Sequence, residues 1–190
     1  MSVQLSLFSD EDSDPAVEDV EGLLLAGGAL VRRLGTARIS VLTDVGWRAE
    51  EIRSGMDTRG LAAELGEAAG GRCSVRSAFD PRLVDMAGRW SAGARSRIPA
   101  GFVLTHRRLR FWAVAAGGHD HAGYLLRVGP HDEHLHEAIG ALLSAAGIPG
   151  AFLGVRAGGP AYRIVGSRRL ARLRELAGRL PVDADPDCWP

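Results

Sequence analysis

The feature that most constrains this fold is a tandem repeat of predicted helices and strands, with a period of about 80–90 residues. Residues 104–182 are predicted to run helix, strand, helix, two strands and helix, and residues 15–90 follow a looser version of that order. Small and polar residues with an internal proline, 91–103, separate the two as a linker. The sequence therefore predicts an α+β protein made of two similar units.

Local signals place the elements of each half. In the first half they predict a helix over 15–34, strands over 37–43 and 47–53, a helix over 57–65, a strand over 72–79 and a helix over 80–90. In the second half they predict a helix over 105–116, a strand over 123–128, a helix over 135–143, strands over 151–156 and 161–165, and a helix over 167–180. Thr105 and Ser167 are the expected N-caps of the first and last of these helices.

One predicted strand, 72–79, separates its two faces cleanly. Its apolar face carries Cys73, Val75, Ser77 and Phe79. Its opposite face carries Arg72, Ser74 and Arg76. Two arginines are thereby expected on a sheet surface that faces away from the core.

Charge is distributed unevenly along the chain. Lysine is absent, and all 23 basic residues are arginines that lie within residues 22–182. That stretch holds only 13 acidic residues and has a net charge of +10, because seven acids precede it and three follow it in the tail, 183–190. A basic body with acidic ends is typical of a nucleic-acid-binding protein. Arginine usage set by codon bias, together with solvated tails, is the alternative explanation.

Several functional classes find no support in the sequence. No apolar run approaches the roughly 18 residues needed to span a membrane, and no secretory signal is visible. The two cysteines, Cys73 and Cys188, have no paired spacing, which fits a reduced cytoplasm. There is no phosphate-binding glycine loop and no nucleophile elbow. We therefore expect a cytoplasmic, nucleoid-associated protein without a membrane partner or a cofactor.

Residues 4–8 resemble the pentapeptide by which bacterial DNA polymerases and repair proteins bind the replication sliding clamp. The five positions are Gln4, Leu5, Ser6, Leu7 and Phe8. The resemblance implies that Leu7 and Phe8 fill an apolar pocket of the DNA polymerase III sliding clamp while Gln4 hydrogen-bonds at its rim. Residues 1–14 are accordingly interpreted as a clamp-binding peptide with a disordered acidic linker. The alternatives are an N-terminal strand or an apolar tail that packs on its own domain.

The first helix of each half is apolar and ends in small residues. The two segments are Gly22-Leu23-Leu24-Leu25-Ala26-Gly27-Gly28-Ala29-Leu30 and Phe111-Trp112-Ala113-Val114-Ala115-Ala116-Gly117-Gly118. Both resemble degenerate helices of the LAGLIDADG homing endonucleases, in the style of the N-terminal domain of the regulator WhiA. The resemblance implies a pseudo-dimer, monomeric with an internal pseudo-two-fold axis. Two such helices would pack side by side at its centre, helped by Gly22 and Ala26, or by Ala113 and Gly117.

The chain departs from that family at the residues that carry its chemistry. In the nucleases each helix ends with an acid that binds Mg²⁺, whereas Gly27 and Ala116 stand at the matching positions and supply no ligand. The nearest acids, Asp19, Glu21 and Asp120, do not fall at those positions. We therefore expect no catalytic residue and no metal at the helix ends.

The resemblance also implies a DNA-binding surface formed by the strands. Eight arginines on predicted strands are the candidate DNA contacts, because the planar guanidinium group binds phosphate and guanine through paired hydrogen bonds. They are Arg38, Arg48, Arg53, Arg72, Arg76, Arg127, Arg156 and Arg163.

Five of the six histidines cluster between residues 119 and 136. They are His119, His121, His131, His134 and His136. Their spacing matches no standard zinc site, and a solvated surface is the interpretation we adopt, with a divalent metal site as the alternative.

Together these features predict a non-catalytic DNA-binding protein that is recruited to the sliding clamp in DNA replication or repair. Three alternatives stay open. They are a clamp-tethered metal-dependent nuclease, a WhiA-like transcription regulator, and an adaptor that binds a further protein through an exposed C-terminal tail, 183–190.

Overall fold

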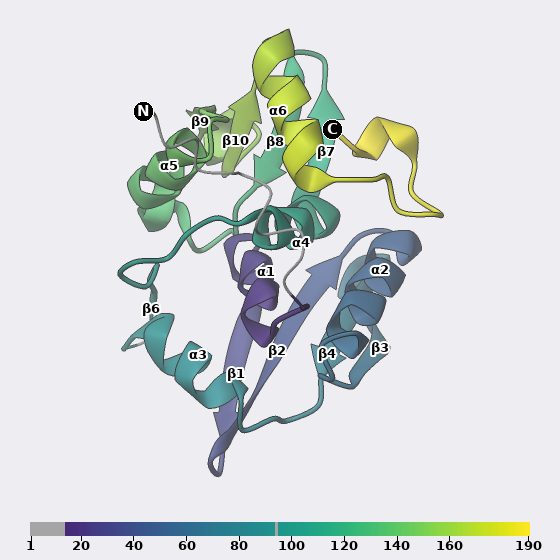
Figure 1. Cartoon of the computed structure of the whole chain (residues 1–190), viewed down its shortest axis with the longest axis vertical. Helices are drawn as coiled ribbons and strands as arrows, with labels where there is room; N and C mark the ends of the chain where they lie inside the picture. Colours follow the sequence, from purple (N-terminus) through teal and green to yellow (C-terminus); the bar gives the residue numbers. More distant parts are fainter. Residues whose placement is uncertain (1–13, 94) are drawn as a thin grey trace, which may run out of the picture.

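A computed structural model describes residues 14–93 and 95–190. Figure 1 shows two units of mixed helix and sheet, one above the other, joined where the helices α1 and α4 meet at the centre. Each unit follows the same order of helix, strand, strand, helix, strand, strand, helix. The tandem repeat predicted from the sequence is therefore present, and it is more regular than the sequence indicated.

The first unit contains a short 3₁₀ helix, η1 (Val17–Glu21), that leads into α1. Its main elements are α1 (Gly22–Leu25), β1 (Ala29–Arg33), β2 (Thr36–Thr43), α2 (Gly46–Asp57), β3 (Ala63–Ala68), β4 (Arg72–Ser77) and α3 (Leu83–Arg89). A small hairpin of β5 (Ser91–Ala92) and β6 (Arg95–Ser96) follows within the segment predicted as a linker.

The second unit repeats the pattern. Its main elements are α4 (His106–Ala116), β7 (Gly117–Asp120), β8 (Gly123–Arg127), α5 (His136–Ala145), β9 (Ala151–Leu153), β10 (Ala161–Ile164) and α6 (Ser167–Ala177). Four short 3₁₀ helices complete the described chain, namely η2 (Ala69–Gly71), η3 (Glu133–Leu135), η4 (Val155–Ala157) and η5 (Pro186–Cys188).

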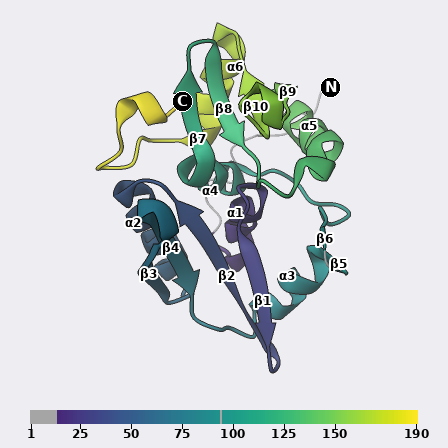
Figure 2. The ribbon, with the colours of Figure 1, turned by 180° about the vertical axis from the view of Figure 1, so that it is seen from behind.

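The two main sheets have equivalent topologies. Their strand orders are β1-β2-β4-β3 and β7-β8-β10-β9, and every neighbouring pair is antiparallel. The second strand of each unit therefore lies beside the fourth. One face of each sheet is covered by helices, and the other face, called the outer face below, is turned toward the viewer in Figure 2.

The first helix is much shorter than the predicted range of 15–34. Gly27 has a φ of +88°, and the amide of Gly28 donates back to the carbonyl of Leu23 at 2.8 Å, which ends the helix. The chain then enters β1 and reverses at Leu34-Gly35, where both φ angles are positive as in a tight hairpin turn. Our helical interpretation of residues 26–34 was wrong because the Gly27-Gly28 stop signal was not used.

Two further elements of the first unit differ from the prediction. Residues 47–53, predicted as a strand, lie in α2, where Ala49, Ile52 and Met56 are buried at helical spacing. Residues 57–65, predicted as a helix, form a turn and the start of β3, because Gly60 has a φ of +69° and the amide of Ala63 donates to Asp57 Oδ1. Strand 72–79 and helix 80–90 are confirmed as β4 and α3.

The second unit matches the prediction closely. The helices and the strands β8, β9 and β10 lie where we expected them, and the hydroxyl group of Thr105 accepts from the amide of Arg108 at the start of α4. Strand β7 was missed because its glycines read as a helix end. Ser167 is not an N-cap, since Gly166 occupies that position and no side chain caps α6.

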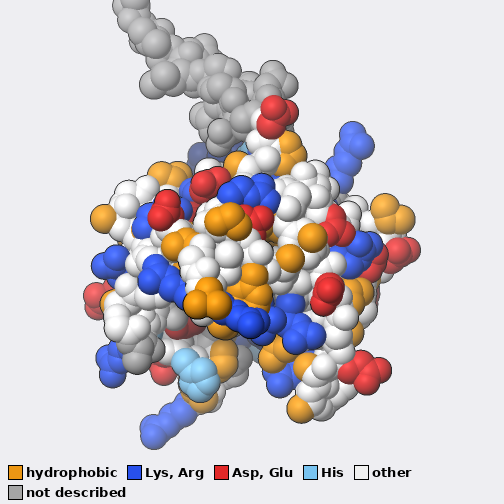
Figure 3. All heavy atoms as spheres, turned by 90° about the horizontal axis from the view of Figure 1, so that it is seen from below, with side chains coloured by type: hydrophobic (Ala, Val, Ile, Leu, Met, Phe, Trp, Pro, Cys, Tyr) orange, Lys and Arg blue, Asp and Glu red, His pale blue; other side chains and the backbone are white. Residues whose placement is uncertain are grey.

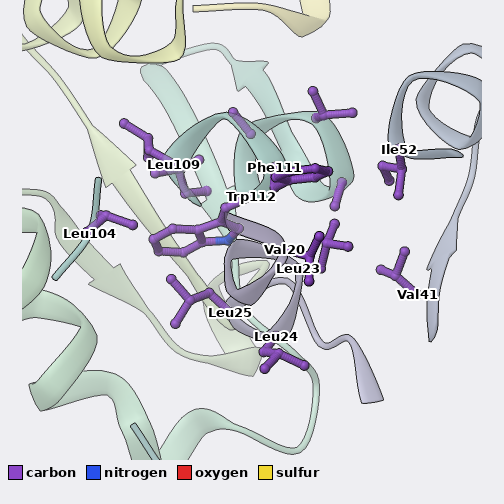
Figure 4. Packing of buried hydrophobic residues seen from close by; sticks show 14 of the residues in the cluster. Val20, Leu23, Leu24, Leu25, Val41, Ile52, Leu104, Leu109, Phe111 and Trp112 are labelled. Carbon is purple, nitrogen blue, oxygen red and sulfur yellow. The ribbon is translucent and has the colours of Figure 1, made fainter. Parts of the chain in front are cut away.

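Helices α1 and α4 pack together at the centre of a continuous apolar core (Figure 4). Leu23, Trp112 and Leu109 are fully buried there. A Cβ atom on Gly22 would lie 1.9 Å from the carbonyl oxygen of Arg108, so the two backbones are in direct contact at that point. The close approach predicted at Gly22 is therefore confirmed. Gly117, which follows α4 as the first residue of β7, instead makes room for the hydroxyl group of Tyr124.

The C-terminal segment packs against the second unit rather than extending from it. Trp189 is only 5% exposed, and its indole Nε1 donates to the carbonyl of Gly178 at 3.0 Å. Its ring lies beside the guanidinium group of Arg110, and Arg174 Nε donates to the carbonyl of Pro190. The adaptor hypothesis needed an exposed C-terminal tail, and that prediction is wrong for Trp189 and Pro190.

Among residues 14–93 and 95–190, no helix is both long enough and apolar enough to cross a membrane.

Candidate nucleic-acid interface

The outer face of the first sheet carries a concentration of arginines. Strand register places Arg38 opposite Val31 and Arg76 between Ser40 and Glu64, and Arg72 lies opposite Ala68 on the same face. Arg33, opposite Thr36, shares this face although the sequence analysis did not select it. Four arginines and a single acid, Glu64, therefore occupy the outer faces of these strands.

These arginines are held by contacts that leave their charge uncompensated. The guanidinium groups of Arg33 and Arg38 lie 5.9 and 4.9 Å from the ring centre of Phe79. Phe79 is therefore outside the core, contrary to its predicted place on the apolar face. Within the described part of the chain, neither of these arginines forms an ion pair, and neither does Arg72 or Arg76. Figure 3 shows a band of arginine side chains across the end of the molecule where β1, β2 and α3 lie.

The outer face of the second sheet is less basic. Arg127 and Arg163 lie on that face beside the buried Leu125. Arg127 is paired in register with Ala161, and Arg163 is paired with Leu125. The amide of Ala122 donates to Asp120 Oδ1 and Arg163 Nε donates to Asp120 Oδ2 at 2.8 Å, and these hydrogen bonds hold the pKa of Asp120 below its usual value. The charge of Arg163 is thereby neutralised, and Arg127 is the exposed, unpaired cation of the second outer face among the described residues.

Three of the eight candidate arginines are not on strands. Arg53 lies on α2 and pairs with Glu50 and Asp57, and Arg156 is exposed in η4. Arg48 is also on α2 but is only 4% exposed. The predicted strand positions were thus wrong for these three and right for Arg38, Arg72, Arg76, Arg127 and Arg163.

Arg48 closes the C-terminal end of the central helix α4. Its Nη1 donates to the carbonyls of Ala113, at 3.2 Å, and Val114, and its Nη2 donates to the carbonyl of Gly117. The last carbonyls of a helix lack partners within the helix and carry its partial negative charge, so a buried cation is favourable there. The Arg48 side chain thus stabilises the helix end. Its guanidinium donors are already used by these carbonyls, so it cannot bind a phosphate through paired hydrogen bonds.

A cavity of about 530 Å³ opens where the ends of α1 and α4 meet between the two outer faces. We call it the helix-end cavity. Its charged or titratable lining side chains are Asp44, Arg48, Arg72, Arg127, His131 and Asp132. It lies at the ends of the two central helices, beside Gly27 and Ala116, the residues that match the metal-binding acids of the nucleases.

Asp44 and Asp132 occupy equivalent places in the two units. Asp44 follows β2 and precedes α2, and Asp132 follows β8 and precedes η3 and α5. The sequence analysis missed both acids, because it placed a strand over 47–53 and so hid the equivalence of the two loops. The two loops differ in length, since Asp44 directly follows β2 whereas four residues separate β8 from Asp132, so the packing of the two units is what brings both acids to one cavity.

Two acids that the sequence analysis considered, Asp19 and Glu21, form ion pairs away from the helix-end cavity. The buried Glu21 carboxylate contacts Arg108 at 2.7 Å and Arg89 at 3.0 Å, and it accepts from the indole Nε1 of Trp90. Asp19 Oδ2 lies 2.7 Å from Arg59 Nη2. Both acids are at the start of α1, at the opposite end from the helix-end cavity.

The histidines do not assemble into one site. His119 hydrogen-bonds with the carbonyl of Trp189, His134 with that of Ser96, and His136 with that of Glu133. Within residues 14–93 and 95–190, no group of three or more His, Cys, Asp or Glu side chains is arranged to hold a metal ion. The helix-end cavity does not fit a divalent cation either, because three arginines surround its two acids.

Comparison with known proteins decides the fold. No model of a protein family matches the sequence, and no curated protein is significantly similar to it. Among solved structures, the homing endonuclease I-WcaI bound to its DNA recognition sequence superposes with a TM-score of 0.60 and 12% identity. That match covers 84% of this chain and 78% of that chain. The chain has a LAGLIDADG-like fold.

A second LAGLIDADG structure agrees. The homing endonuclease I-DmoI, in complex with its nicked target DNA and manganese, superposes with a TM-score of 0.52 and 13% identity. The match covers 84% of this chain and 94% of that chain. At such low identities the LAGLIDADG-like fold, with its tandem repeats in a pseudo-dimer, is what the comparison establishes.

Proposed function

We propose that this chain binds DNA along the outer faces of its two sheets, without cleaving it, and is recruited to the replication sliding clamp through residues 4–8. One observation carries the DNA-binding part. Arg33, Arg38, Arg72 and Arg76 share the outer face of the first sheet with a single acid, and Arg127 continues this basic surface on the second.

Electrostatics supports this proposal. Duplex DNA attracts a surface on which several guanidinium groups have no acidic partner, because each contact releases condensed counterions from a phosphate. Arg72 and Arg76 are exposed and lie on one strand at an even spacing, so both point to the same side. The exposed arginines lie on sheets, whose strands hold their positions more firmly than loops would.

The absence of cleavage is supported by the composition of the helix ends. Gly27 and Ala116 offer no ligand, and the cation Arg48 fills the carbonyl end of α4. The nuclease alternative would have to use Asp44 and Asp132, which share their cavity with Arg72 and Arg127. These positively charged neighbours would repel a metal ion from the two carboxylates.

The DNA-binding proposal is tested by fluorescence anisotropy with a labelled duplex across a range of salt concentrations. An Arg72→Ala, Arg76→Ala double variant should bind more weakly and flatten the slope of log affinity against log salt by about 0.9 for each lost phosphate contact. Arg168→Ala, Arg169→Ala is the matched control, since it removes the same charge from α6 on the opposite side of the second sheet. Equal losses in the two variants would contradict a specific role of the outer face.

Clamp recruitment rests on Gln4, Leu5, Ser6, Leu7 and Phe8, which lie outside the described residues. The complete pentapeptide supports this recruitment, because a short peptide binds an apolar pocket through a few anchor side chains. In a pull-down with purified clamp, Leu7→Ala and Phe8→Ala should each cost about 2 kcal/mol. A flanking Ser2→Ala, Ser9→Ala variant is the control and should bind as the wild type does. Retention of the clamp by the Leu7→Ala, Phe8→Ala variant would refute recruitment by this peptide.

A further inference from the structure

We propose that the helix-end cavity accepts one unpaired nucleotide of a bound DNA strand, with its phosphate on Arg72 and Arg127 and its base on Asp132. The inference rests on the proposed DNA binding and adds a ligand class to it. The cavity is lined by residues of both sheets, among them Arg72 and Arg127, so DNA that follows both outer faces would reach it.

The size and charge of the cavity fit a ligand of mixed polarity. Its volume of about 530 Å³ lies in the range of small-molecule pockets, about 300–1,000 Å³. Arg72 and Arg127 come from different sheets and are both exposed, so they offer two unpaired guanidinium groups to one anionic group. A nucleotide combines an anionic phosphate with a base that carries hydrogen-bond donors.

The unpartnered carboxylate of Asp132 is the observation that indicates a contact with the base. Its side chain belongs to a residue that is only 9% exposed, and no described residue donates a hydrogen bond or an ion pair to its carboxylate. Its oxygens are not among the buried side-chain atoms that lack a hydrogen-bond partner, so they face the cavities that Asp132 lines, where a donor group of a ligand can replace water. Asp132 also lines two smaller cavities beside the helix-end cavity, so its carboxylate is accessible to a ligand.

The backbone around Asp132 is packed to keep that carboxylate in place. A Cβ atom on Gly129 would lie 2.4 Å from Asp132 Oδ2 and 2.7 Å from the Cα atom of Gly27. Glycine at position 129 therefore lets the loop after β8 touch the end of α1 and sets the carboxylate beside the central helices. This contact joins the two units at the floor of the cavity.

The chemistry of a carboxylate predicts which bases it prefers. Adenine, cytosine and guanine carry an exocyclic amino group that donates to a carboxylate, whereas thymine has none. An unpaired base is required, because in a duplex the Watson–Crick edge is already paired and stacked. We thus expect an unpaired cytosine to bind better than an unpaired thymine at the same place in the same duplex.

The test compares three duplexes of one sequence by competition anisotropy with the full chain. One is fully paired, one carries a single extra cytosine and one a single extra thymine. The wild type should bind the cytosine bulge about 10-fold more tightly than the thymine bulge, the effect of one hydrogen bond to a charged group. Asp132→Ala should bind both bulges alike, and Asp183→Ala, which removes an exposed acid far along the chain, should keep the preference.

A structural role for Asp132 would give a different pattern. Since its carboxylate has no partner among the described residues, Asp132→Ala should unfold at an unchanged or higher urea concentration than the wild type, whereas a structural carboxylate would lower it. Equal affinity of the wild type for all three duplexes would overturn the inference and leave DNA binding intact. Binding of no duplex at low salt would overturn the proposed function as well. Free deoxycytidine monophosphate that competes as strongly as the cytosine bulge would show that the ligand is not part of a DNA strand.

Discussion

Replacement of Arg48 by alanine tests whether one buried cation holds the central helix in place. Arg48 comes from α2 and is bound to three carbonyl oxygens at or just beyond the end of α4, so it links the first unit to the second. Its Nε lies 3.6 Å from Asp44 Oδ1 and its guanidinium group lies 4.7 Å from the ring centre of Trp47. Truncation removes all of these contacts at once.

The expected cost follows from the acceptors that lose their donor. The carbonyl of Ala113 also accepts from the amide of Gly117, so it keeps one partner, whereas the carbonyls of Val114 and Gly117 lose the guanidinium group that donates to them. Each buried acceptor left without a partner costs about 1–3 kcal/mol. With the cavity left by the side chain, Arg48→Ala should lower the free energy of unfolding by about 4 kcal/mol.

Urea denaturation followed by circular dichroism measures this change. Arg53→Ala is the matched control, because it removes the same side chain from the same helix where that side chain pairs only with exposed acids. Its cost should stay below about 1 kcal/mol. If Arg48→Ala and Arg53→Ala destabilised the protein equally, Arg48 would not be the cation that closes α4.

Two further predictions concern the central contact and the second sheet. Gly22→Ala should lower the free energy of unfolding by about 3 kcal/mol or more in urea denaturation, because its Cβ atom would meet the backbone of Arg108 at 1.9 Å. Gly46→Ala is the control and should be neutral or slightly stabilising, because its Cβ atom would meet nothing within 4 Å. Equal effects of the two substitutions would contradict the direct contact of α1 with α4. The lowered pKa of Asp120 contributes stability that is complete above its unfolded value and is lost as the pH falls below about 4. The urea midpoint of the wild type should therefore fall more steeply in that range than that of Asp120→Asn, and parallel pH profiles would refute the stabilising role of this carboxylate.

The sequence predicted the second unit better than the first, for physical reasons. Helices α4, α5 and α6 carry apolar residues at helical spacing and end at or near glycines, so periodicity located them. In α2 the buried face includes Arg48, and a charged residue at a core position disguised the helical period. Strand β7 begins with two glycines and pairs only through its backbone register with β8, which no local pattern reveals.

The candidate interface was predictable only in part. Alternation in residues 72–77 correctly placed Arg72 and Arg76 on the outer face. The fate of Arg48 and Arg163 depended on partners distant in sequence, the end of α4 and Asp120, which a single sequence does not disclose. Asp132 is separated from Gly27 by most of the chain, and the contact between their loops arises from the packing of the two units.

The most direct test of the central claim measures binding and cleavage on the same labelled duplex, with Mg²⁺ and with Mn²⁺. We expect a complex that weakens with salt, while the DNA stays intact in both metals. Cleavage by the wild type that disappears in an Asp44→Asn, Asp132→Asn variant would contradict this claim and would assign a nuclease activity to the helix-end cavity. A failure to form any complex at low salt would contradict the DNA-binding surface itself.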